Sequence, residues 1–182
     1  MRRYEYPSGA VREGQILGGK IHGQGKYTAS DGKQVFEGHF VQNLLCGPGK
    51  EYHGDRLVYE GDFKNDSRHG KGKLTLADGG FVTGDFRHGK PHGRVHEVRL
   101  DAQGRPVQYK GEVLRGKWAG VGVLTDVCGE FSGGFLDGRR HGRGCRRAGG
   151  LPRPEPDGFP ARVLWELRAC LPGLRRLRAL EL

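Results

Sequence analysis

Two recurring patterns in this sequence contain residue types that bind metal ions or phosphate groups in other proteins. Histidine occurs at corresponding points along the chain, at His22, His69, His92 and His141, and imidazole is a common zinc ligand. The pattern GxxxxGK, which is typical of phosphate-binding loops, occurs at 14–20, 84–90 and 111–117. These are the residues from which a catalytic or metal-dependent function would have to be built.

Neither pattern is expected to support that chemistry. The residue after each GxxxxGK motif is Ile21, Pro91 or Trp118, so the Ser or Thr hydroxyl that would bind magnesium is missing. If successive copies form hairpins, corresponding histidines lie two strand spacings apart, about 10 Å, whereas zinc–nitrogen bonds are about 2.0–2.1 Å long. We therefore expect no metal site, no cofactor and no catalytic residue, and a protein that is not an enzyme.

Both patterns recur because the chain is built on a repeat of about 23 residues. The repeat occurs in six copies. In each copy a glycine directly follows the position at which four of the copies have histidine: Gly23, Gly47, Gly70, Gly93, Gly120 and Gly142. Another glycine lies nine residues before each of these, and a third lies two residues after each, except at Val95. A four-residue excess follows around 101–104. We expect a longer loop there, with poorer packing at Val95 and Glu97.

Each copy of the repeat has the pattern of a β-hairpin. Because side chains alternate between the two faces of a strand, Tyr59, Gly61 and Phe63 share one face. Glu60 lies on the other face, together with Lys73 of the returning strand. Glycine has no Cβ, so a neighbouring ring has room to lie across the bare backbone. The sequence thus predicts an all-β fold, a single-layer antiparallel sheet of stacked hairpins.

The aromatic residues of this sheet are the candidate partner-binding residues. One face of a single layer would be left partly open, and a long aromatic stripe suits an amphipathic helix or an extended peptide. The candidates are Phe36, Phe40, Tyr59, Phe63, Phe86, Tyr109, Phe131 and Phe135. The alternative is that these rings form only the core of the sheet.

The chain divides into four segments. Residues 1–10 form a partial repeat, 11–146 form six hairpin repeats, 147–160 form a linker rich in proline and glycine, and 161–182 form a tail. Apolar residues recur near helical spacing in the tail, which predicts a short C-terminal α-helical segment. Its candidate lipid-binding residues are Arg162, Arg168, Arg175, Arg176 and Arg178. The tail is expected to cap the aromatic stripe, to bind a partner or to lie on an acidic membrane surface.

Composition narrows the class of protein and of partner. The formal net charge of +10 favours anionic partners, but basic residues are interleaved with acidic ones, so nucleic acid is the least favoured of them. The four cysteines form no CxxC pair, and no apolar run approaches the ~20 residues that span a bilayer. Without the apolar stretch of a signal peptide, we expect a cytoplasmic protein.

The clearest copy of the repeat resembles a known family. Residues 59–63 (YEGDF), 69–72 (HGKG) and 78–79 (DG) are similar to the MORN (membrane occupation and recognition nexus) repeat, and the resemblance covers roughly residues 2–146. It implies a scaffold or adaptor that binds a protein partner in a cytoskeletal, ciliary or membrane-associated setting. Homodimerisation, acidic-phospholipid binding through the tail and regulation of a partner enzyme remain as alternatives.

Overall fold

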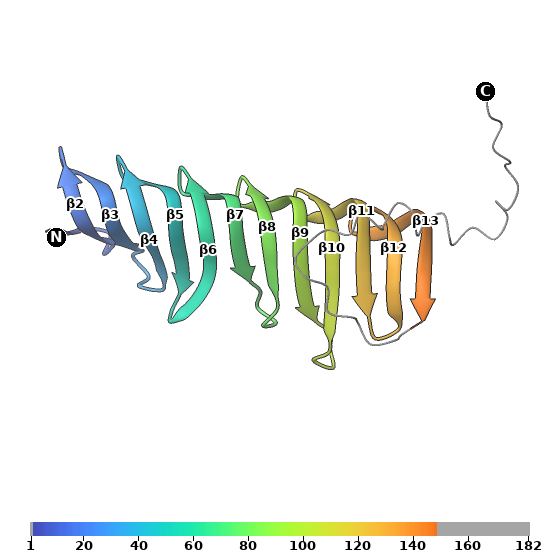
Figure 1. Cartoon of the computed structure of the whole chain (residues 1–182). Coiled ribbons are helices and arrows are strands. Elements are labelled where there is room, and N and C mark those ends of the chain that lie inside the picture. Colours follow the sequence, from blue (N-terminus) through green and yellow to red (C-terminus); the bar gives the residue numbers. More distant parts are fainter. Residues whose placement is uncertain (1, 149–182) are drawn as a thin grey trace, which may run out of the picture.

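The computed structural model describes residues 2–148, which form one open antiparallel sheet of 13 strands. Every strand is hydrogen-bonded to the next one in the sequence, so the sheet is a simple meander (Figure 1). The strands are β1 (Arg2–Glu5), β2 (Val11–Leu17), β3 (Lys20–Thr28), β4 (Gln34–Val41), β5 (Leu44–His53), β6 (Arg56–Lys64), β7 (Ser67–Thr75), β8 (Phe81–Arg87), β9 (Lys90–Leu100), β10 (Pro106–Leu114), β11 (Lys117–Asp126), β12 (Gly129–Leu136) and β13 (Arg139–Ala148). The predicted all-β, single-layer fold is confirmed, whereas the predicted C-terminal helix and its five arginines lie outside the described residues.

Two-residue turns join the two strands of each repeat. Both residues of every such turn have positive φ, between 49° at Gln42 and 84° at Gly116, as in the type I′ turns that match the twist of a hairpin. The six turns lie along one edge of the sheet, at the top of Figure 1. We call this edge, with the residues that flank each turn, the turn edge; it comprises 17–20, 41–44, 64–67, 87–90, 114–117 and 136–139.

The four extra residues of the fourth repeat lengthen two strands and leave the loop unchanged. The β9–β10 connection, 101–105, has the same span as the β7–β8 connection, 76–80. Pairing between β9 and β10 instead continues to Leu100↔Pro106, so this hairpin extends furthest at the lower edge of Figure 1. The expected longer loop is therefore wrong, because the Asp101 carboxylate accepts hydrogen bonds from the backbone N–H groups of Gln103 and Arg105, both at 2.9 Å, and closes the turn.

A row of glycines crosses the sheet from β2 to β13. Register partners run Gly14, Gly25, Gly38, Gly49, Gly61, Gly72, Gly84, then Val95, then Gly111, Gly122, Gly133 and Gly144. Rings lie directly over this row: a Cβ at Gly72 would come 2.5 Å from Cζ of Tyr59, and one at Gly122 would come 2.7 Å from Cε2 of Tyr109. The predicted use of glycine, to make room for rings, is confirmed.

The first strand of each repeat bends immediately after its glycine. The register between β6 and β7 shifts between Gly61 and Phe63, and equivalent shifts follow the glycines of the other five repeats. Such bulges bend a strand and increase its twist. The rings on either side of the bend therefore come together: Tyr59 and Phe63 pack edge to face with centroids 5.1 Å apart.

Candidate binding surface

The aromatic rows are closed, which corrects the expectation of a partly open stripe. Six of the eight candidate residues are at most 3% exposed: Phe40, Tyr59, Phe63, Phe86, Tyr109 and Phe135. Only Phe36 and Phe131 are partly exposed. Rings of successive repeats cover one another; for example, the ring centroids of Tyr59 and Phe86 are 5.0 Å apart. In the free protein these rings are therefore the core of the sheet.

Two tyrosines illustrate how the rings are fixed in place. The hydroxyl of Tyr59 donates to the carbonyl of Asp62 (3.1 Å), and that of Tyr109 donates to the carbonyl of Glu112 (2.8 Å). Burial, assisted by the charge of Asp62, raises the pKa of Tyr59 to about 12, and burial also raises the pKa of Tyr109. Both hydroxyls therefore remain protonated donors at neutral pH.

Three charged residues inside the ring rows, Arg68, Glu51 and Glu97, have hydrogen-bond partners. Arg68 donates two hydrogen bonds to the Glu51 carboxylate, at 2.8 and 2.9 Å, and its guanidinium lies 5.3 Å from the centroid of the Tyr59 ring. Glu97 accepts from Nε1 of Trp118 at 2.6 Å. Val95 and Glu97 are both buried, so the poorer packing expected there is wrong. A hydrogen-bonded carboxylate fills the position that Leu74 and Leu124 occupy in two other repeats.

The opposite face of β1 to β7 carries charges of alternating sign. Register partners run Arg3, Glu13, Lys26, Glu37, Lys50, Glu60 and Lys73, one from each strand. Ion pairs form between Lys26 and Glu37 (3.1 Å) and between Lys50 and Glu60 (3.2 Å). The predicted sharing of a face by Glu60 and Lys73 is confirmed by their direct pairing. Because each cation faces a carboxylate, this surface attracts charged partners weakly.

The turn edge collects exposed apolar side chains. Among residues 2–148 nine large apolar residues are exposed, and five of them flank its turns: Leu17, Val41, Leu44, Leu114 and Leu136. Four of them, all but Leu44, occupy the same repeat position, the last residue before the turn. In the two central repeats that position holds Lys64 and Arg87. This recurrence of an apolar residue before the turn is visible in the sequence and is the signal that identifies the turn edge.

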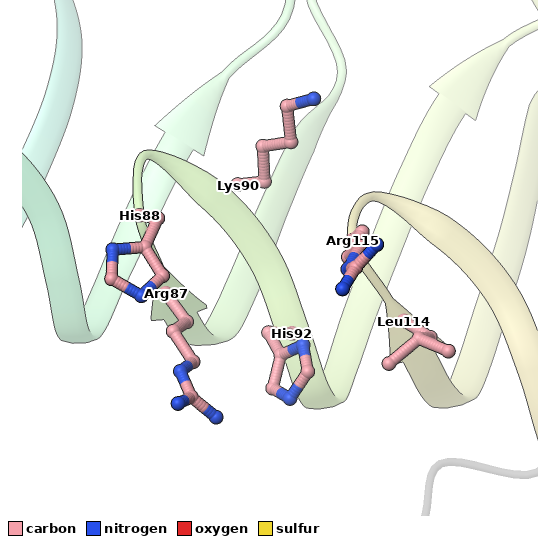
Figure 2. A pocket seen from close by; sticks show the side chains of 6 residues that line it. All are labelled: Arg87, His88, Lys90, His92, Leu114 and Arg115. Atoms are coloured by element: carbon pink, nitrogen blue, oxygen red, sulfur yellow. The ribbon is translucent and has the colours of Figure 1, made fainter.

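A basic hollow of about 560 Å³ lies at the centre of the turn edge. Its lining residues are Arg87, His88, Lys90, His92, Leu114 and Arg115. Figure 2 shows Arg87 and His92 directed toward the same side, with Leu114 and Arg115 contributed by the neighbouring hairpin. Three cations and two imidazoles thus line this cavity, and no carboxylate of the described residues contributes to it.

The basic surface continues into the preceding repeat. An adjacent hollow of about 470 Å³ shares Arg87, His88 and His92 and adds Lys64 and His69. Its single carboxylate, Asp85, forms an ion pair with Lys71 at 2.7 Å. Two of the four histidines at the repeat position, His69 and His92, therefore line this surface. His22 lies elsewhere, with its ring centroid 6.4 Å from that of His39. Among residues 2–148 no group of three His, Cys, Asp or Glu side chains is arranged to hold a metal ion.

No helix long and apolar enough to cross a membrane occurs in the described part of the chain. Comparison with family profiles finds six matches to the MORN repeat, at 13–34, 36–57, 59–81, 83–94, 109–127 and 131–149. The gap between the fourth and fifth matches begins at Val95 and spans the lengthened β9–β10 hairpin. No curated protein matches the chain.

Proposed function

This chain belongs to the MORN-repeat family, and we propose that it is a non-catalytic scaffold that binds a protein partner along its turn edge. Repeats of this family generally serve as protein- or membrane-binding modules. The supporting observation is that five of the nine large apolar residues exposed among 2–148 lie on this one edge, four of them at the same repeat position, so a partner that spans several repeats meets the same apolar contact at several turns. Six of the eight candidate aromatic residues are buried, so we assign the contact surface to the turn edge in their place.

The turns are held rigidly relative to one another, as a scaffold requires. The second residue of a turn donates its backbone N–H to the preceding repeat: Asn43 to the carbonyl of Ile21 (3.0 Å), and Gly116 to that of Pro91 (2.8 Å). Equivalent bonds run from Asp66, Gly89 and Gly138. Successive turns are two strands apart, about 10 Å. A partner thus meets a fixed series of contact points.

Site-specific photo-crosslinking in cells tests this proposal. A benzophenone amino acid is placed at Leu17 or Leu114 of the full chain, and, as a control, at exposed Lys33 on the opposite edge. We expect both turn-edge positions to form an adduct with the same protein, and Lys33 to form none, in variants whose circular dichroism is unchanged. Equal labelling from Lys33, or adducts with lipid alone, would contradict the proposal.

A further inference from the structure

We infer that the basic hollow at the centre of the turn edge binds an acidic segment of a protein partner in extended conformation. This inference rests on the proposed scaffold function and assigns the chemistry of the partner at one place on the turn edge. The inference is supported by the uncompensated charge of the hollow, the basic residues of two turns, and the spacing of the cations.

The charge of the hollow has no counterpart within the described chain. Arg87, Lys90 and Arg115 form no ion pair with any residue among 2–148. The charged ladder on the opposite face differs, because there lysines and glutamates alternate strand by strand. A hollow that is lined by one sign of charge focuses its field and attracts the opposite charge. The missing anion is therefore expected from outside the described residues.

The two turns that form the hollow carry basic residues at their first position, and one of them, Arg115, fits its backbone poorly. His88 and Arg115 have φ values of 51° and 53°, in the left-handed region where asparagine, aspartate and histidine are enriched among non-glycine residues and arginine is not. The equivalent turn positions of the other repeats hold Gly18, Gln42, Asn65 and Asp137, none of which is basic. Residues that break a local rule are most often retained for function. At both positions the replacement adds a basic group to the same hollow.

The spacing of the cations favours an extended acidic chain over a single phosphate group. Sites for one phosphate converge several donors on one point, whereas the cations here are distributed over three repeats, from Lys64 through Arg87 to Arg115. Adjacent repeats are about 10 Å apart, close to the rise of three residues in the extended polyproline II conformation, in which every third side chain points to the same side. Carboxylates at every third residue would match this spacing, and exposed Leu114 provides an apolar contact beside them.

Fluorescence anisotropy with a defined peptide tests the inference on the full chain. The probe is a fluorescein-labelled twelve-residue peptide with glutamate at every third position, and the control peptide has glutamine there. Vesicles containing phosphatidylserine form a separate arm. We expect binding of the glutamate peptide only, which weakens as salt is raised because exposed charges are screened. Binding to the vesicles without binding to the peptide would overturn the inference.

Matched variants locate the site. Arg115→Asn removes a cation and creates the favoured Asn-Gly turn, so it should preserve or raise the unfolding midpoint while it weakens peptide binding about three- to fivefold. Arg87→Gln combined with Arg115→Asn should weaken it about 10- to 25-fold. The control, Lys33→Gln with Arg143→Gln, removes the same charge from exposed positions elsewhere and should change binding less than about twofold.

Equal losses in the control and in the hollow variants would show that only net charge matters, and would overturn the assigned site. Absence of peptide binding together with persistent crosslinks from Leu17 would refute this inference alone. Absence of both peptide binding and turn-edge crosslinks would refute the scaffold proposal as well.

Discussion

Replacing Gly72 with alanine is expected to lower the free energy of unfolding by about 3 kcal/mol, near the upper limit for overpacking a core. Alanine normally stabilises a strand relative to glycine, so the backbone alone predicts a small gain. Here the added Cβ would overlap the ring of Tyr59, 2.5 Å from Cζ. That ring is fully buried, and it is confined by the rings of Phe63 in the same strand and Phe86 in the next repeat, so it cannot move aside.

A double-mutant cycle with Tyr59→Leu separates this overlap from other effects of the substitution. Leucine occupies the same row at Leu74 and Leu124, so the variant keeps the apolar character of the site. We expect the cost of Gly72→Ala to fall below about 1 kcal/mol in the leucine background, which is strong coupling between contacting residues. Urea denaturation measures both costs, and equal costs in the two backgrounds would contradict this account of the glycine row.

The second large effect is expected from Arg68→Leu, which should cost about 2–3 kcal/mol. Removing one partner of a buried ion pair leaves the other charge uncompensated, and the side chains of Arg68 and Glu51 are only 22% and 13% exposed. The substitution also removes the cation that lies against the Tyr59 ring.

The double variant Glu51→Leu with Arg68→Leu should recover most of that loss, to within about 1 kcal/mol of the natural chain. Well-packed apolar residues often replace a buried ion pair without loss of stability. The repeat itself provides the precedent, because Leu45 precedes Arg68 by one repeat and Leu74 follows Glu51 by one repeat. Thermal unfolding monitored by circular dichroism provides the comparison. A double variant as unstable as the sum of its single variants would contradict this view of the pair.

The fold was predictable because one repeat period determines almost everything about it. The positions of Gly61 and Gly72 gave the register, and alternation assigned Tyr59 and Glu60 to opposite faces, as observed. Even the pairing of Glu60 with Lys73 followed, since cross-strand partners are set once the turn is placed. The helical tail and its arginines lie outside the described residues, so that part of the prediction remains a prediction.

The closure of the aromatic rows was not predictable from alternation alone. A period of two indicates which face carries Tyr59 and Phe63, but it does not show that the strand bends between them. The bulge brings the two rings into contact and seals the row. The turn edge was missed for a related reason: His88 and Arg115 occupy turn positions, and only their placement beside Arg87 and His92 in space reveals a shared hollow. Such clustering depends on the stacking of different repeats.

Oxidative footprinting of the full chain, read by mass spectrometry, tests most directly the claim that the rings are core and the turn edge is contact surface. We expect hydroxyl radicals to modify Tyr4, Leu17 and Leu114 readily, in line with their exposure. Tyr59 and Phe63 should be modified only after the protein is unfolded. Modification of Tyr59 and Phe63 in the folded chain at rates close to that of Tyr4 would show that the aromatic face is open after all.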